Sequence, residues 1–166
     1  GWEIDYTAKV SGGPLALGFT ENFLFPASLD MPPYLYLRND QPLGVPTVTK
    51  AFKQPNRPGP ATADFEAVNV LPDFAREARE FIARETTNKE KPFFLYLSYT
   101  APHYPLHAWP EDIAKYQGKY DSGYESIRKA RYQRMVKMGL IDPAKSPMQP
   151  WNGRAWTNLK GIELEK

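Results

Sequence analysis

Residues 91–106 read KPFFLYLSYTAPHYPL, and this stretch carries the main evidence for the fold class. Residues 93–99 within it form an unbroken apolar and aromatic run of strand length, and a run without polar alternation predicts a strand covered on both faces. Pro102 and Pro105 follow, and because each fixes φ they prevent a helix from starting there. His103 lies between them, just beyond the carboxyl end of the predicted strand, where ligands bind in open α/β sheets.

The composition sets limits on the class of protein. The chain has 166 residues, of which 42% are apolar and 24% charged, so it can form a domain with a core and is not a disordered polyampholyte. The net charge of +2 gives no reason to expect binding to nucleic acid or to a membrane surface. No run approaches the ~20 apolar residues of a membrane span. There are no cysteines, which excludes disulfides, thiolate metal sites and a cysteine nucleophile.

The clearest predicted helix covers residues 72–87. Pro72 suits a first helical turn, and Asp73 favours the positive end of the helix dipole. Four apolar residues recur at i, i+4, i+7 and i+8 and form one stripe: Phe74, Ala78, Phe81 and Ile82. Since the predicted strand at 93–99 follows after a short link, the two form a helix-to-strand unit of an α/β layer.

Two further elements are indicated by local patterns. Residues 34–38 are strand-like and end at Asn39-Asp40, a hairpin-type turn. A second helix is predicted over 122–138, with Gly139 as its left-handed C-terminal cap, and its basic residues are interpreted as a solvated helix face. The first 60 residues otherwise carry little periodicity, so long irregular loops are expected.

Three side chains are candidates for a chemical role in the sequence. His103 is either a turn histidine whose ring contacts a backbone carbonyl, or a proton donor or anion ligand at the mouth of the sheet. His107 follows four residues later, but Pro105 between the two argues against a helical metal pair. Ser28 is a lone serine, and no Gly-x-Ser-x-Gly nucleophile turn occurs in the chain.

The segment 92–106 resembles the strand and turn of arylsulfatase-type sulfatases. Its most specific part is the string Thr-Ala-Pro-His-x-Pro-Leu at 100–106. The resemblance runs collinearly from about residue 6 to residue 151, and the other segments that carry it are 13–14, 17–19, 26–34, 112–121 and 138–142.

The resemblance implies a fold, an activity and a site. The fold is α/β, here a partial alkaline-phosphatase-like sandwich in which helices flank a β-sheet. The activity is hydrolysis of sulfate esters at a calcium site by a formylglycine made from cysteine or serine, with small sulfate esters or sulfated sugars as substrates. Carried over by position, His103 is the sulfate-contacting histidine and a candidate catalytic acid, and Ser28 lines the same pocket. The resemblance also implies a periplasmic, secreted or lysosomal location.

Several motifs of the family are absent. No Ser is followed by x-Pro-x-Arg and there is no Cys, so the formylglycine motif is missing. The paired calcium-binding aspartates near the family's N-terminus, the Gly-Lys-Trp-His-type segment and the later Asp-Asn-Gly segment are missing as well. Asp30 and Asp40 are isolated carboxylates, whereas calcium needs several converging oxygens, so no metal site is predicted within this chain.

Residues 1–166 are thus predicted to be one partial sulfatase catalytic domain, without the N-terminal nucleophile region and the C-terminal metal-binding region. The parent activity is sulfuric ester hydrolysis, and the chain alone is expected to be inactive. It is either a fragment or a degenerate descendant. Two other functions stay open. One is a truncated module that binds a complementary chain or self-associates through unpaired sheet edges, and the other is a related phosphoester hydrolase.

Overall fold

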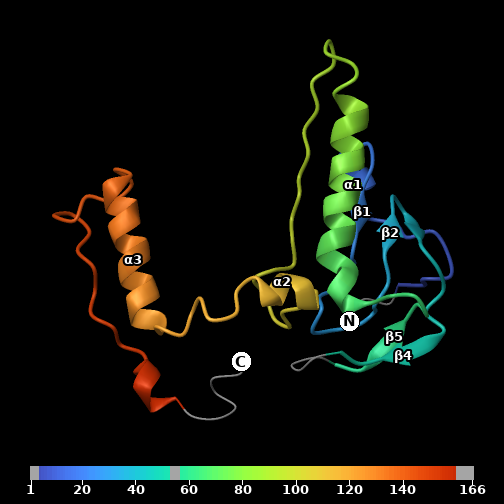
Figure 1. Ribbon diagram of the computed structural model, residues 1–166. Coiled ribbons are helices and arrows are strands. Elements are labelled where there is room, and N and C mark those ends of the chain that lie inside the picture. The colour runs from blue at the N-terminus through green and yellow to red at the C-terminus, as the bar shows by residue number, and fades with distance from the viewer. Residues whose placement is uncertain (1–3, 53–56, 160–166) are drawn as a thin grey trace. The chain divides into compact units, whose positions relative to one another are not determined.

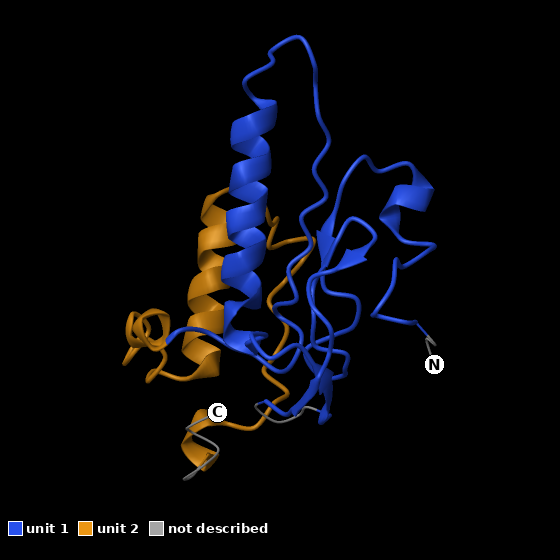
Figure 2. Cartoon of the chain, turned by 90° about the vertical axis from the view of Figure 1, so that its right-hand side faces the viewer, with its two compact units in different colours: residues 1–109 blue, residues 110–166 orange. Residues whose placement is uncertain are grey.

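The computed structural model describes residues 4–52 and 57–159. The chain divides into two compact units, residues 1–109 and residues 110–166, which Figure 2 shows in blue and orange. We refer to them as unit 1 and unit 2.

Unit 1 combines short strands with one long helix (Figure 1). Its strands are Phe23–Leu24 (β1), Leu37–Arg38 (β2), Gln41–Pro42 (β3), Val48–Lys50 (β4) and Gly59–Ala61 (β5). Its helices are the 3-10 helices Pro14–Leu17 (η1) and Ala67–Asn69 (η2) and the α-helix Val70–Glu85 (α1). β1, β2 and β3 form one antiparallel sheet in that order, and β4 and β5 form a second antiparallel pair. The predicted mixture of helix and sheet is confirmed, as helices with small antiparallel sheets.

The predicted hairpin turn at Asn39-Asp40 is confirmed. β2 and β3 pair on either side of it, beginning with Leu37 opposite Pro42. Asn39 has a φ of 57°, a left-handed conformation that Asn tolerates better than most residues. The strand before the turn is shorter than predicted, because the ladder covers only its last two residues, while Tyr34 makes an isolated bridge to Ala61.

The core of unit 1 is a cluster of aromatic rings. Tyr34 and Phe65 are buried at its centre, with ring centroids 5.9 Å apart. Phe65 also lies 5.3 Å from Phe25 and 5.2 Å from Tyr36, centroid to centroid. Aromatic side chains bury large apolar areas and prefer such offset contacts. The strands are only two or three residues long, so each sheet has few hydrogen bonds, and the ring packing adds contacts between the segments that carry them.

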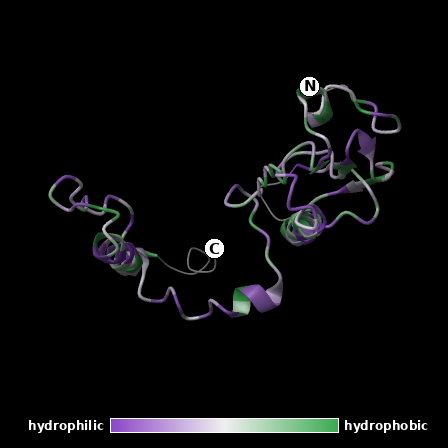
Figure 3. Ribbon diagram, turned by 90° about the horizontal axis from the view of Figure 1, so that it is seen from above, coloured by the Kyte–Doolittle hydropathy of each residue, from purple (hydrophilic) through white to green (hydrophobic). Residues whose placement is uncertain are grey.

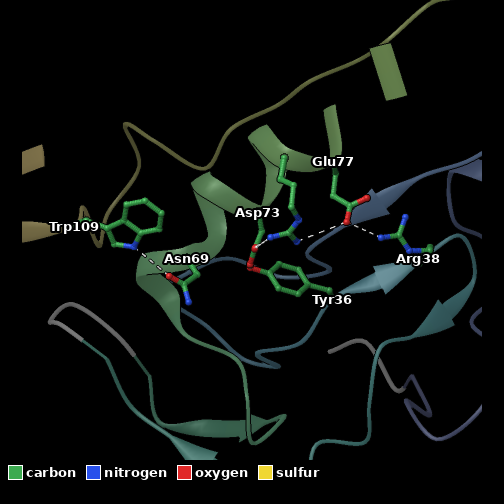
Figure 4. A network of polar contacts seen from close by, with 7 residues as sticks. Tyr36, Arg38, Asn69, Asp73, Glu77 and Trp109 are labelled. Atoms are coloured by element: carbon green, nitrogen blue, oxygen red, sulfur yellow. Dashed lines mark hydrogen bonds and ion pairs between the residues drawn. The ribbon is translucent and has the colours of Figure 1, made fainter. Parts of the chain in front are cut away.

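α1 confirms the first predicted helix, with both ends two residues earlier than expected. Phe74 and Ala78 of its apolar stripe are buried, whereas the two stripe residues nearer its C-terminal end are less covered. Just before the helix, Asn69 accepts a hydrogen bond from Trp109 Nε1 at 3.1 Å (Figure 4). The half of α1 near its N-terminus therefore lies against the core, and the other half projects beyond it.

A chain of polar contacts joins α1 to the β2 region (Figure 4). The Tyr36 hydroxyl donates to Asp73 Oδ2 at 2.9 Å, and Arg38 forms an ion pair with Glu77 at 2.6 Å. Arg76 contacts both carboxylates, at 2.6 Å from Asp73 and 3.7 Å from Glu77. Burial raises the pKa of Tyr36, and its hydrogen bond to Asp73 raises the pKa further, so this phenol stays a donor at neutral pH.

The prediction of a buried strand at 93–99 is wrong for the described part of the chain, since the segment is extended but belongs to no sheet. It runs back beside α1 (Figure 1), and the Phe93 ring lies 5.2 Å from the Phe81 ring in an edge-on contact. Phe94 is 75% exposed. The physical reason is that no strand among the described residues pairs with the segment. An apolar run becomes a buried strand only where ladder partners and cover on both faces exist.

Unit 2 contains the α-helices Pro110–Ala114 (α2) and Tyr124–Lys137 (α3) and the 3-10 helix Trp156–Asn158 (η3). α3 confirms the second predicted helix. Gly139 has a φ of 71°, its N–H donates to Val136 O at 2.9 Å, and Leu140 N–H donates to Met135 O at 2.9 Å. This is the expected left-handed cap, in the Schellman arrangement. No residue of α3 is buried, and much of it is drawn in the hydrophilic purple of Figure 3.

Among the described residues, no helix is both long enough and apolar enough to cross a bilayer.

Candidate functional site

A groove in unit 1 reaches the two residues predicted for the site. Its volume is about 930 Å³, and residues 94–100 line it together with side chains of the 14–28 segment and of α1. Most of the lining is apolar or aromatic, as at Phe19 and Phe74. Ser28 and His103 both line this groove. Small-molecule sites typically occupy about 300–1,000 Å³ with a few polar groups in an apolar wall, so the groove is a candidate binding site.

Ser28 is held in place by a short turn. Leu29 beside it is buried, and Met31 N–H donates to Ser28 O at 2.9 Å. The Ser28 hydroxyl donates to Asp30 Oδ1. A serine hydroxyl has one hydrogen and two acceptor lone pairs, so in this arrangement the Ser28 oxygen acts toward the groove as an acceptor.

His103 lies in a turn between Pro102 and Pro105. The turn is closed by a hydrogen bond from His103 N–H to Thr100 O at 3.0 Å, and Pro105 is fully buried and anchors it. The imidazole is exposed, and its Nδ1 lies 2.6 Å from Tyr104 O. This is the carbonyl contact expected of a turn histidine. When Nδ1 donates there, Nε2 of the neutral ring is an acceptor, and it becomes a donor only when the ring is protonated.

Asp30 links the two predicted residues electrostatically. Its pKa is lowered chiefly because the Ser28 hydroxyl donates to its carboxylate; desolvation opposes this effect, and the positive charges of His103 and Arg57 lower the pKa a little further. Arg57 N–H also donates to Asp30 O at 3.0 Å. The interpretation of Asp30 as an isolated carboxylate missed these contacts. The Ser-x-Asp spacing at 28–30 could have predicted the Ser28–Asp30 hydrogen bond, because short polar side chains often form hydrogen bonds with groups two residues away.

The second histidine lies in a different environment. His107 is partly buried, and its ring packs edge-on against Phe52 with centroids 6.4 Å apart. Ser28 and His103 therefore line the groove, with Asp30 bonded to Ser28, and His107 packs against Phe52 instead.

Calcium, which the family resemblance implies, does not fit the residues present. Within 4–52 and 57–159, no three His, Asp or Glu side chains gather into a group that could hold a metal ion. Asp30 already accepts the Ser28 hydroxyl, and Asp40 pairs with Lys9 at 2.6 Å. Calcium takes about 6–8 oxygen ligands, so these separate carboxylates supply no calcium site.

Comparison with known proteins identifies sulfatases as relatives. An arylsulfatase of Klebsiella aerogenes is 37% identical over 86 residues, which cover 48% of this chain and 18% of that protein. An uncharacterized sulfatase of Schizosaccharomyces pombe is 37% identical over 90 residues, which cover 52% of this chain and 16% of that protein. No family model and no solved structure matches the chain. The chain thus covers less than a fifth of the length of these relatives, and the predicted resemblance to part of an arylsulfatase-type sulfatase is confirmed.

We predict that Ser28→Ala raises the pKa of Asp30 toward its ordinary value, because the hydroxyl bond that stabilises the carboxylate is lost. Asp30 then also contributes less to stability. A lowered pKa stabilises the folded chain above the ordinary pKa of about 3.8, and this contribution is lost as pH falls through the lowered value. A carboxyl-detected NMR titration measures the shift. Thr7→Ala removes a comparable hydroxyl from Asp5 and serves as the control. An unchanged Asp30 pKa in Ser28→Ala would contradict the contact.

Proposed function

We propose that this chain is an internal part of an arylsulfatase-type catalytic domain whose parent activity is the hydrolysis of sulfate esters. The observation that supports this best is that Ser28 and His103, far apart in the sequence, line the same groove. The similarity of about half the chain to proteins named as sulfatases supports the same family. Small sulfate esters or sulfated sugars are the proposed substrates.

His103 is proposed to contact the sulfate and to donate a proton to the leaving alcohol. Hydrolysis of a sulfate ester needs an acid for the leaving oxygen and donors or positive charge for the sulfate oxygens. An exposed imidazole at the groove provides both once it is protonated. Because Nδ1 contacts Tyr104 O, Nε2 is the nitrogen that takes these roles.

Ser28 is proposed to line the same pocket. The hydroxyl hydrogen of Ser28 is donated to the Asp30 carboxylate, so the hydroxyl must rotate before it can donate to a sulfate oxygen. The Asp30 carboxylate repels an anion nearby, whereas a protonated His103 attracts it.

The proposal also covers the architecture of the parent domain. In it, residues 93–99 form a strand of an alkaline-phosphatase-like sandwich. The formylglycine and the calcium ligands belong to parts of the domain other than residues 1–166. A periplasmic, secreted or lysosomal location is proposed on family grounds alone.

A second candidate function is a non-catalytic module that binds a partner chain. The observation that favours it is the exposure of the aromatic segment 93–99, in which Tyr96 is 71% exposed. Large exposed apolar surfaces usually mark interaction sites.

We predict that the pure chain does not turn over sulfate esters, because it lacks the nucleophile motif and its described residues supply no metal site. Release of nitrophenol from nitrophenyl sulfate, followed with and without added calcium, measures this. Metal-dependent release above the buffer rate would refute the prediction of inactivity.

We further predict that inorganic sulfate binds the chain at His103. In an NMR titration with sodium sulfate, the His103 ring signals should shift saturably. The His107 ring, packed against Phe52, provides an internal control that should not respond. Ser28→Ala should weaken the response, and sodium chloride at matched ionic strength should not reproduce it. Equal shifts at both histidines, or none at either, would count against the proposed pocket.

A further inference from the structure

The carboxylate of Asp30 lies one hydrogen bond away from the groove. Ser28 lines the groove, and its hydroxyl donates to Asp30 Oδ1. The turn that carries both residues is closed by the hydrogen bond from Met31 N–H to Ser28 O at 2.9 Å, and Arg57 N–H donates to Asp30 O at 3.0 Å. An anion whose oxygen contacts the Ser28 hydroxyl therefore has its centre on the order of 5 Å from the negative charge of Asp30.

The arginines that line the groove do not offset this carboxylate, because each is already ion-paired with a glutamate that lines the groove as well. Arg38 pairs with Glu77 at 2.6 Å, and Arg84 pairs with Glu21. Among the described residues of the lining, His103 is then the remaining group that can carry a positive charge. An anion bound between the serine and the histidine therefore experiences the full repulsion of the neighbouring carboxylate.

A carboxylate in this position discriminates between anions by their charge. Coulomb repulsion is proportional to the charge of the bound anion, so a doubly charged anion is repelled twice as strongly as a singly charged one. Sulfate monoesters carry one negative charge, whereas phosphate monoesters carry close to two above neutral pH, because their second pKa is about 6. In a water-like medium, each additional charge at about 5 Å weakens binding roughly four-fold.

We propose that Asp30 is a specificity-determining residue of the groove, and that its carboxylate favours singly charged anions such as sulfate monoesters over doubly charged phosphate monoesters. The inference rests on the proposed contact between sulfate and His103. It also bears on the alternative of a phosphoester hydrolase, because the carboxylate that tolerates a sulfate ester acts against a phosphate monoester. Asp30 acts on the charge of the bound anion and takes no part in proton transfer.

Methyl sulfate and methyl phosphate test this selection, because they are similar in shape and differ by one charge at about pH 7.5. Each is titrated separately into the chain, and its dissociation constant is read from the His103 ring signals by NMR. The ratio of the methyl phosphate constant to the methyl sulfate constant should be above one. Asp30→Asn keeps an oxygen that can accept the Ser28 hydroxyl and removes the charge, so it should lower this ratio at least about three-fold.

Asp5→Asn is the matched control, because Asp5 accepts the Thr7 hydroxyl in a comparable contact but does not line the groove. It changes the net charge equally and should leave the ratio unchanged. In the unmodified chain, raising the salt from about 20 mM to about 500 mM should bring the ratio closer to one. A ratio of one or less, a ratio unaffected by Asp30→Asn or by salt, or an equal fall in Asp5→Asn would overturn the inference and leave the His103 contact standing. The absence of a saturable shift with either anion would overturn both.

Discussion

The packing of aromatic rings around Tyr34 and Phe65 is the interaction on which the rest of unit 1 depends. The strands are too short to fix the irregular first part of the chain by hydrogen bonds alone. Tyr34 and Phe65 are nearly without exposed surface, and Leu29 belongs to the same buried cluster. Ser28 precedes Leu29, so the core sets the position of this groove-lining serine.

Two separate anchors position the two groove residues Ser28 and His103. Core contacts hold the Ser28 turn, and the buried Pro105 holds the His103 turn. Between these anchors, Phe93 contacts Phe81 of α1, and Phe94 contacts Phe19 while staying 75% exposed. The groove therefore carries a histidine and a serine in a mostly apolar lining, and the described residues supply no group of carboxylates that could hold a calcium ion.

The two helices could be predicted from sequence because a helix satisfies its own backbone, and its apolar stripe or cap is visible locally, as at Phe74 and Gly139. The absence of a strand at 93–99 could not be predicted, because an apolar run shows that a segment needs to be covered but does not show whether a neighbouring strand is present to pair with it. The approach of Ser28 to His103 followed from the family resemblance and not from spacing, because contacts between distant residues leave no local pattern. The Ser28–Asp30 bond was within reach of local reasoning and was missed.

We propose that these 166 residues are part of a larger sulfatase, and the intact mass of the protein in its native source decides between this and a short independent protein. An antibody raised against this chain would isolate the native species for mass measurement. We predict a species several times heavier than 18.9 kDa, since the matched regions cover only 18% and 16% of the two sulfatase relatives. A native species of 18.9 kDa would contradict it.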